Sequence, residues 1–492
     1  MRPETSLSQR VAKGGLWIFT FRLVDNGFRV VKLVILARLL APKDFGLFGI
    51  ALLAISTLET FSQTGFQTAL VQKKANIAHY LDTAWTVSAI RGTFLFILLF
   101  LSAPSIALFF NTPDAFLIIQ VIGASILLNG FNNIAIVYLQ KELEFSRQFI
   151  YQLSVTLADF IVVIAVALAF KNVWALVFGL LAGNTMGLIV SYVVHPYRPR
   201  LRLDIRRIKD LFGFGRWIFG SSILAFLITQ GDDAFVGKFL GATMLGFYQM
   251  AYKIANMPTT EITQVISQVT FPAYSKIQDN LPRLREAYAR VLQLTAFLSF
   301  PIAGLIFALA SDFTKVFLGE RWMPMVPAMQ VLVLWGLIRS IGTATGQVFL
   351  SIGKPEIVAK LQFIVLILLG ILIYPLSIKW GILGTSLAVL VSTFAPNFIA
   401  FLMIIRTLQY AAFNLVRMIV IPLINTMLLI ILIALLRVYW IHPGIEGLFL
   451  SVIFGSLLYI GMTLLCINFF NYKVFENIKM GIYALRHSSE RL

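Results

Sequence analysis

The chain has little charge and almost no cysteine. Only 13% of its 492 residues are Asp, Glu, Lys or Arg, and Cys466 is the single cysteine. One cysteine excludes an intrachain disulfide, and the four scattered histidines lack the close spacing of a metal-binding motif. The sequence patterns of serine hydrolases, zinc proteases and P-loop proteins are also absent. We therefore expect no metal, no cofactor and no catalytic residue, and we do not expect an enzyme.

Long hydrophobic runs are present instead. Hydrophobic residues make up 59% of the chain, and its mean hydropathy is +0.86. Apolar runs longer than about 18 residues are typical of membrane-spanning helices, whereas barrel strands are shorter and alternate. The sequence predicts an all-α polytopic membrane protein with about 14 transmembrane helices. The predicted spans lie at about 14–40, 45–71, 83–110, 115–139, 148–170, 173–194, 212–240, 245–271, 288–310, 325–351, 361–378, 381–405, 418–436 and 447–469.

The positive charge of the chain lies mainly between these spans. There are 40 Lys and Arg residues against 22 Asp and Glu residues, a formal net charge of +18. Most of the cations lie in short loops and are concentrated in every second loop, which is the pattern that sets membrane topology. We therefore expect no nucleic-acid partner. The same bias predicts that both termini lie in the cytoplasm.

The first half of the chain is repeated in the second half. At a constant shift of 200 residues, Gly15, Trp17, Ile18, Phe19 and Gly46 match Gly215, Trp217, Ile218, Phe219 and Gly246. Both copies begin on the same side of the membrane, so the sequence predicts a parallel pseudo-two-fold repeat of two six-helix lobes. The predicted domains are an N-lobe at 1–200, a C-lobe at 201–405, and two extra C-terminal helices with a cytoplasmic tail at 406–492. Chance similarity between apolar helices is the alternative.

Charged residues form a stripe on the first span. Arg22, Asp25, Arg29 and Lys32 fall within an arc of about 80° at about 100° per residue, and Asn26 lies beside them. Charge at membrane depth costs several kcal/mol unless it faces water, a partner or an anionic ligand. The stripe is therefore the strongest functional signal in the sequence.

Other spans carry further polar residues, mainly in the repeated pairs of helices. The additional candidates for binding substrate are Arg91, Lys253, Arg339, Gln63, Gln67, Gln264 and Gln268. Guanidinium groups suit phosphate oxygens and amides suit sugar hydroxyls, so these residues predict a phosphorylated, sugar-bearing cargo in a hydrated cleft between the two halves. The acids expected to balance charge, or to couple transport to a proton or sodium gradient, are Asp25, Glu59, Asp159 and Glu261.

Structural alternatives stay open for several of these residues. Asp25 and Arg29 are four residues apart and can pair within one helix. The glutamines can serve as ordinary hydrogen-bond partners between helices.

Five segments carry a resemblance to a known family. In chain order they are ARLLAPKDFGLFGI (37–50), GFQTALVQKK (65–74), LQKELEF (139–145), FPAYSKIQDN (271–280) and VFLGERWMPMVPAMQVL (316–332). As an ordered set they resemble the polysaccharide exporters, the Wzx-type branch of the multidrug/oligosaccharidyl-lipid/polysaccharide flippase superfamily, and especially exporters of the colanic acid kind. The similarity runs from about residue 10 to 405.

The resemblance implies a fold and a function. It implies two six-helix lobes around a central cavity, in the cytoplasmic (inner) membrane of a bacterium. It also implies that the protein flips undecaprenyl-diphosphate-linked oligosaccharide across this membrane by alternating access, for exopolysaccharide, capsule or lipopolysaccharide assembly. The expected partners are this lipid and the bilayer, with a polysaccharide polymerase as a further candidate, and the protein is expected to be a monomer. The matching motif residues Asp44, Phe45, Gly46, Lys141 and Glu142 are expected to be structural hinges.

Two other functions stay open at this point. The first is a cation-coupled drug exporter of the same superfamily, which the excess of Arg and Lys in the first lobe argues against. The second is a non-transporting membrane scaffold of a polysaccharide polymerase complex, which would not need charges inside its spans.

Overall fold

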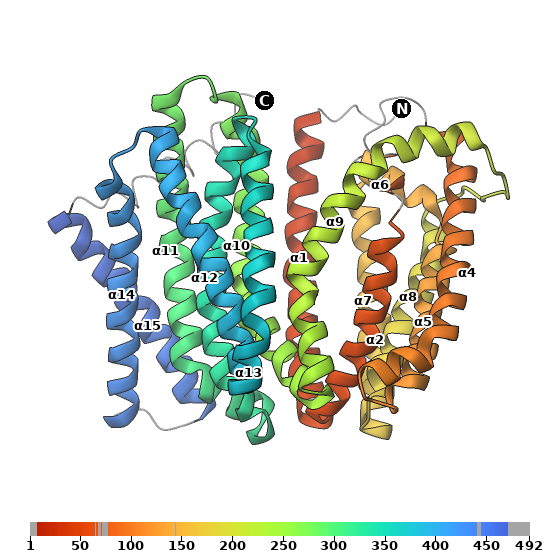
Figure 1. Ribbon diagram of the computed structural model, residues 1–492, viewed down its shortest axis with the longest axis horizontal. Helices are drawn as coiled ribbons and strands as arrows, with labels where there is room; N and C mark the ends of the chain where they lie inside the picture. The colour runs from red at the N-terminus through yellow and green to blue at the C-terminus, as the bar shows by residue number, and fades with distance from the viewer. Residues whose placement is uncertain are drawn as a thin grey trace. The chain divides into compact units, whose positions relative to one another are not determined.

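Helices make up the regular structure of this protein. The computed structural model describes residues 7–63, 65–66, 70, 77–142, 144–439 and 444–470, and no strand occurs among them (Figure 1). The earlier helices are α1 (Leu7–Leu39), α2 (Pro42–Phe61), α4 (Ala78–Phe109), α5 (Ala115–Gly130), α6 (Val137–Lys141), α7 (Phe145–Phe170), α8 (Trp174–Val194) and α9 (Ile205–Phe239). The later helices are α10 (Ala242–Lys276), α11 (Leu281–Phe313), α12 (Val326–Ser351), α13 (Pro355–Leu408), α14 (Ala412–Tyr439) and α15 (Ile445–Phe470). Short turns of other helix types are η1 (Ile134–Ile136), η2 (Thr314–Leu318) and η3 (Glu320–Met325).

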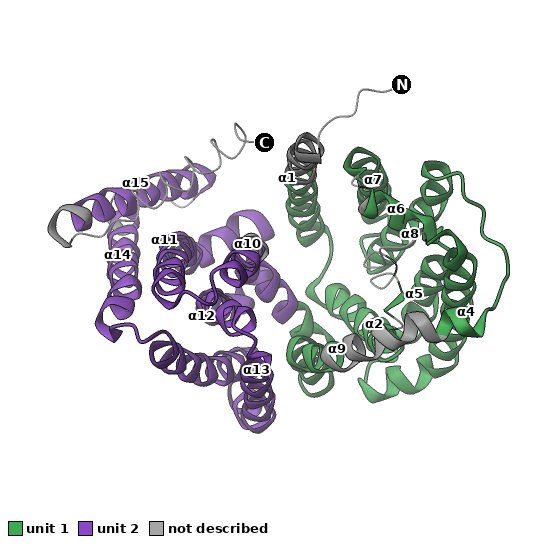
Figure 2. Cartoon of the chain, turned by 90° about the horizontal axis from the view of Figure 1, so that it is seen from above, with its two compact units in different colours: residues 1–246 green, residues 247–492 purple. Residues whose placement is uncertain are grey.

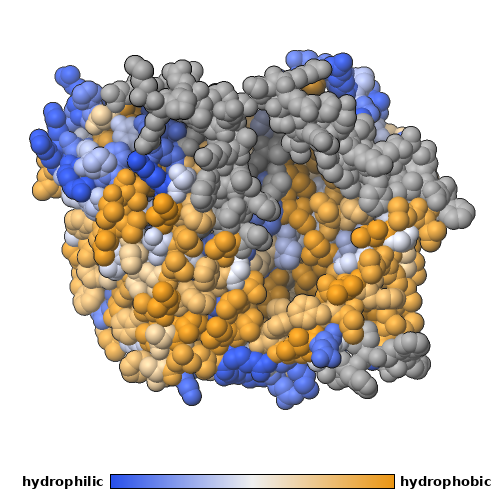
Figure 3. Space-filling model, turned by 180° about the vertical axis from the view of Figure 1, so that it is seen from behind, coloured by the Kyte–Doolittle hydropathy of each residue, from blue (hydrophilic) through white to orange (hydrophobic). Residues whose placement is uncertain are grey.

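The prediction of an all-α polytopic membrane protein is confirmed. Nine helices of the described chain are long and apolar enough to cross a membrane. Each predicted span overlaps one of these helices, and 361–378 and 381–405 share α13. The predicted span 115–139 covers α5, η1 and most of α6, and the predicted span 45–71 extends beyond the end of α2. On the face drawn in Figure 3, hydrophobic residues cover most of the middle, and hydrophilic residues gather at the upper left and along the lower edge. The exact number of spans stays a prediction.

The long helix α13 is interrupted where the sequence predicts two spans. Gly381 adopts φ +60° and ψ −139°, a conformation that side chains with a Cβ strongly disfavour. A few residues on either side, the hydroxyls of Ser377 and Thr385 are hydrogen-bonded at 2.8 Å. Eight residues of straight helix would separate these groups by about 12 Å, so the chain turns back at Gly381.

The chain divides into two compact units, residues 1–246 and 247–492 (Figure 2). Each has its own apolar core. In unit 1, one cluster of buried residues comprises Leu36, Leu40, Val163, Ala167, Ala175 and Leu176. In unit 2, one cluster of buried residues contains Tyr274, Tyr288 and Phe349. The domain boundaries predicted near residues 200 and 405 stay predictions.

Two glycines that the repeat matches lie at a very close helix contact within unit 1. A Cβ on Gly46 would come within 1.6 Å of the Ala242 carbonyl oxygen, and a Cβ on Gly246 within 1.9 Å of the Pro42 carbonyl oxygen. The pairs 42 and 242, and 46 and 246, both differ by the predicted shift of 200. No side chain larger than that of glycine fits at either position unless the helices move apart.

The aspartate next to this contact has a structural role. Asp44 accepts hydrogen bonds from the Ala41 backbone N–H at 2.8 Å and from the Val173 backbone N–H at 3.1 Å. One carboxylate therefore caps the start of α2 and holds the residue that precedes α8.

Candidate functional site

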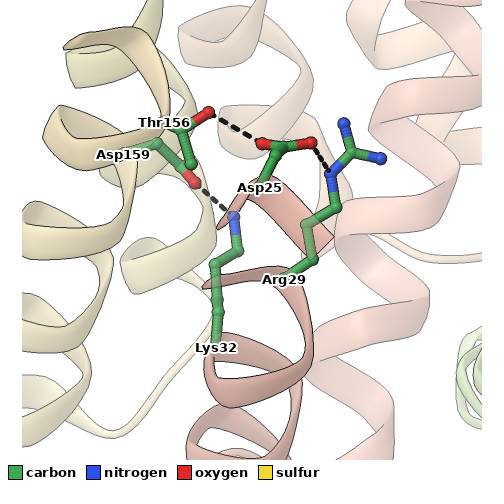
Figure 4. A network of polar contacts seen from close by, with 5 residues as sticks. All are labelled: Asp25, Arg29, Lys32, Thr156 and Asp159. Carbon is green, nitrogen blue, oxygen red and sulfur yellow. Dashed lines mark hydrogen bonds and ion pairs between the residues drawn. The ribbon is translucent and has the colours of Figure 1, made fainter. Parts of the chain in front are cut away.

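The charged stripe of α1 faces a polar patch on α7. Helix α7 packs against both α1 and α8 in unit 1, which brings Thr156 and Asp159 next to the stripe (Figure 4). The Lys32 ammonium pairs with the Asp159 carboxylate, and the Arg29 Nε lies 2.8 Å from the Asp25 Oδ2. We call Asp25, Arg29, Lys32, Thr156 and Asp159 the ion-pair network.

Within the network, the Asp25 carboxylate has partners for both of its oxygens, whereas the Arg29 guanidinium uses only one of its nitrogens. Asp25 is only 7% exposed, and its second oxygen accepts a hydrogen bond from the Thr156 hydroxyl at 2.9 Å. The Arg29 side chain is 62% exposed, and Figure 4 shows its two terminal nitrogens pointing away from Asp25. Arg29 makes no other ion pair or hydrogen bond within the described chain. The helical pairing of Asp25 with Arg29 is thus present, and it still leaves guanidinium donors open.

A cavity of about 260 Å³ lies against the network. Its lining includes Asp25, Arg29, Lys32, Thr156 and Asp159 together with Phe28, Val155, Phe160, Leu180, Gly183 and Asn184. Arg29 and Lys32 are therefore paired with carboxylates, but they are not sealed inside packed protein. The Asn184 amide is a lining residue that sequence reasoning missed, because it is a single polar side chain in an apolar span.

A second and larger cavity, of about 710 Å³, lies between α2, α4, α5 and α7 of unit 1. We call it the amide pocket. Its lining residues are Glu59, Thr60, Gln63, Gly65, Phe66, Ser88, Arg91, Gly92, Ile126, Asn129, Gly130, Asn132, Asn133, Ile134, Ile136, Gln148, Tyr151 and Gln152. The structure therefore brings together the predicted residues Glu59, Gln63 and Arg91, but it places them in a different cavity from Arg29 and Lys32.

Arg91 is held by the end of a neighbouring helix. Its Nε and Nη2 donate to the Ser62 hydroxyl at 3.0 and 2.9 Å, and Nη2 also donates to the Glu59 carbonyl oxygen at 3.0 Å. Ser62 is the C-cap of α2, and Glu59 lies in the last turn, where backbone carbonyls have no amide partner further along the helix. Arg91 thus fixes α2 against α4 while its side chain lines the pocket.

Most polar residues of the amide pocket were not predicted. Gln148 and Gln152 lie one helical turn apart on α7, while Asn129 lies in the last turn of α5 and Asn132 just beyond it. The spacing of the two α7 glutamines was a usable signal, since residues four apart share a helix face. The asparagines gave no such signal, because they lie where the helix ends.

A connector segment between α8 and α9 contacts one lining residue of this pocket, Asn133. Between α8 and α9, the Tyr197 hydroxyl donates to the Asp82 carboxylate, which also accepts the Arg200 backbone N–H at 3.1 Å. Burial and the Asp82 carboxylate raise the pKa of the Tyr197 phenol, so it remains a donor at neutral pH. The Asn133 amide in turn donates to the Tyr197 carbonyl oxygen at 2.9 Å. These contacts tie the pocket to the start of α4.

In unit 2, the predicted Arg339 lies on a smaller cavity of about 350 Å³. Its Nη2 donates to the Thr260 hydroxyl at 2.6 Å, and its guanidinium carbon lies 4.8 Å from the centre of the Trp335 ring. The same cavity is lined by the amides of Gln347, Gln362 and Asn397.

The remaining predicted residues are placed as follows. Lys253 and Gln264 are exposed on α10, and Glu261 is half-buried on the same helix. Arg22 and Asn26 are half-buried on α1. Gln67 lies outside the described residues, and the side chain of Gln268 lies outside the described side chains. A diphosphate site that combines cations of both units stays a prediction.

Comparison with known sequences finds relatives across most of the chain. The family described as polysaccharide biosynthesis protein matches residues 35–327. The lipopolysaccharide biosynthesis protein WzxC of Escherichia coli (strain K12) is 26% identical over 358 residues, which cover 72% of this chain and 73% of that protein. The teichuronic acid biosynthesis protein TuaB of Bacillus subtilis (strain 168) is 24% identical over 371 residues, covering 75% and 77%.

Comparison with solved structures finds transporters that share this fold. The lipid II flippase MurJ in an inward closed conformation superposes with a TM-score of 0.72 at 15% identity, covering 93% of this chain and 99% of that one. An inward-facing multidrug resistance transporter of the MATE family superposes with a TM-score of 0.60 at 16% identity, covering 78% and 95%. At this identity the likeness is one of fold.

Proposed function

Because the chain belongs to the polysaccharide biosynthesis protein family, we propose that it flips an undecaprenyl-diphosphate-linked oligosaccharide from the cytoplasmic to the periplasmic leaflet of a bacterial inner membrane. The product would supply exopolysaccharide, capsule or lipopolysaccharide assembly. Relatives named for lipopolysaccharide and teichuronic acid biosynthesis, and the shared fold of a lipid II flippase, support this function. The observation that carries the proposal is the exposed guanidinium of Arg29 on a membrane helix, beside a cavity.

The chemistry of the cargo explains the cations. A diphosphate and several sugars cannot enter hydrocarbon without losing their water, which is prohibitively costly. The Arg29 fork provides donors for phosphate oxygens, and Lys32 adds a nearby positive charge. The Asp25 and Asp159 carboxylates hold these cations in place until the anionic cargo arrives.

The same acids supply a basis for coupling. An anion that binds Lys32 competes with Asp159, and an Asp159 released from its partner takes up a cation more readily. Protonation or sodium binding at Asp159 or Asp25 would then link the occupancy of the cavity to an ion gradient.

The setting of the transporter completes the proposal. We place both termini in the cytoplasm, because of the loop charges, and the two lobes alternate access by rocking. The protein acts as a monomer that delivers its product to a polysaccharide polymerase. The cleft between the lobes and the role of the last two helices belong to the proposal as well.

Flipping in proteoliposomes tests this function. The full chain is reconstituted, and a fluorescent undecaprenyl-diphosphate-linked oligosaccharide is followed by its accessibility to a membrane-impermeant quencher, with and without proton and sodium gradients. We expect faster flipping than in protein-free liposomes. Transport of a lipophilic cationic dye without lipid flipping would support the drug exporter instead, and no transport of either would support a scaffold.

A further inference from the structure

The amide pocket differs from the ion-pair network in its chemistry. Its charged lining residues are Glu59 and Arg91, whose formal charges cancel. Two of the three Arg91 nitrogens already donate to the end of α2. The lining therefore offers little net attraction to an anion such as a diphosphate.

Several side-chain amides of this pocket have donors or acceptors that form no hydrogen bond within the described chain. The side chains of Gln63, Gln148 and Gln152 form no hydrogen bond with any other described residue. The Asn132 Oδ1 is buried and has no hydrogen-bond partner in the described chain. Asn133 contrasts with them, because its Oδ1 accepts the Ala135 backbone N–H at 3.0 Å and its Nδ2 donates to the connector. Buried amide atoms without partners are costly, so a ligand that satisfies them gains binding energy.

A hydroxyl-rich, uncharged ligand matches this lining. Each sugar hydroxyl is both donor and acceptor, as is each Asn or Gln amide. Phe66 and Tyr151 add aromatic side chains for the apolar face of a sugar ring. A volume of about 710 Å³ lies within the range of roughly 300–1,000 Å³ that is typical of ligand sites.

We infer that the amide pocket binds uncharged sugar units of the cargo, separately from the diphosphate. The inference rests on the proposed function and adds a sugar-reading site to it. The residues that carry it are Gln148 and Gln152 of α7, Asn129 of α5, and Asn132 just beyond the end of α5. Arg91 serves as a positioning residue that holds α2 against this site.

Binding to the full chain in nanodiscs tests the inference. The two probes are undecaprenyl diphosphate alone and undecaprenyl diphosphate bearing a neutral triglucosyl group. The variants are Gln148→Ala with Gln152→Ala, and Asn129→Ala. The matched control is Gln120→Ala, which removes an α5 amide that donates to the Phe100 carbonyl outside the pocket. Melting temperatures check folding, and the single variants Gln148→Ala and Gln152→Ala replace the double variant if it unfolds.

We expect the wild type to bind the sugar-bearing lipid more tightly than the bare lipid. The pocket variants should raise the Kd for the sugar-bearing lipid about tenfold, since each loses amide–hydroxyl hydrogen bonds, and leave the Kd for the bare lipid unchanged. The control should bind both lipids as the wild type does.

Other results would overturn the inference, and they distinguish a failure of the sugar site from a failure of the proposed flippase function. Equal wild-type affinity for the two lipids, or pocket variants that bind both like the wild type, would refute the sugar site while leaving the flippase proposal intact. Pocket variants that lose the bare lipid equally would also refute it. A wild type that binds neither lipid would refute the proposed function, and the sugar site with it.

Discussion

The ion-pair network and the amide pocket lie in the same unit, yet they deal with polarity inside a membrane in opposite ways. The network uses full charges that partner one another across α1 and α7, with a cavity of about 260 Å³ beside them. The pocket uses neutral amides around a cavity of about 710 Å³, and its one cation is occupied by helix carbonyl and hydroxyl groups. Charge in a span is stable only when it faces a partner, water or an anionic ligand, whereas amides can remain open for a ligand at a lower cost.

This difference separates two tasks that one cargo requires. The diphosphate of a lipid-linked oligosaccharide needs cations, and its sugars need donors and acceptors without net charge.

The largest effect is expected at the cross-helix ion pair. Lys32→Ala removes a cation from the cavity and leaves the Asp159 carboxylate without its partner. We expect flipping to fall to the level of protein-free liposomes and polymer export to be lost in cells, while the protein remains in the membrane. Normal polymer levels in this variant would contradict the assignment.

Arg29 should show a smaller, graded effect. Arg29→Ala removes the exposed guanidinium, and we expect flipping to slow at least tenfold. Arg29→Lys keeps a charge near Asp25 but loses the planar fork, so it should retain an intermediate rate. The rates of both variants are compared with that of the wild type in the same liposomes, and an Arg29→Lys rate equal to the wild-type rate would show that the fork geometry has no role.

Arg91 should affect stability more than transport. Arg91→Ala deletes the hydrogen bonds to Ser62 and to the Glu59 carbonyl, which we expect to lower the free energy of unfolding by roughly 2–3 kcal/mol. Thermal unfolding of the detergent-solubilised chain measures this loss. A variant as stable as the wild type, but unable to bind the bare lipid, would move Arg91 from a positioning role to a direct role at the diphosphate.

The smallest effect is expected at an ion pair outside both sites. Lys43 lies 2.6 Å from Asp114, with both side chains more than half exposed. Exposed pairs contribute about 0–1 kcal/mol, so Lys43→Ala should flip lipid and melt as the wild type does. A strong loss of flipping here would mean that positive charge matters wherever it lies, and the special status of the network would fall.

The class of fold could be predicted from the sequence, because long apolar runs identify membrane-spanning helices. Even the turn of α13 near Gly381 falls between two predicted spans. The resemblance to Wzx-type exporters is confirmed by the polysaccharide biosynthesis family that matches residues 35–327 together with the similarity to WzxC. The repeat also marked Gly46 and Gly246, which lie at one helix contact.

Which polar residues share a cavity was harder to predict from the sequence. The stripe of α1 predicted Asp25, Arg29 and Lys32, since periodicity within one helix is visible in sequence. The pairing of Lys32 with Asp159 depends on how α7 packs against α1, a contact 127 residues apart in the chain. The amide pocket depends on four helices at once, so its asparagines at the end of α5 could not be assigned from spacing alone.

The most direct test of the account replaces the cross-helix pair without leaving a lone charge. Lys32→Met combined with Asp159→Leu removes both charges at similar volume, a change that often leaves stability intact. Flipping of the fluorescent lipid-linked oligosaccharide is then measured in proteoliposomes. We predict a well-folded protein that flips no faster than protein-free liposomes do. Flipping at the wild-type rate would contradict the account, because the pair would then serve only to hold the two helices together.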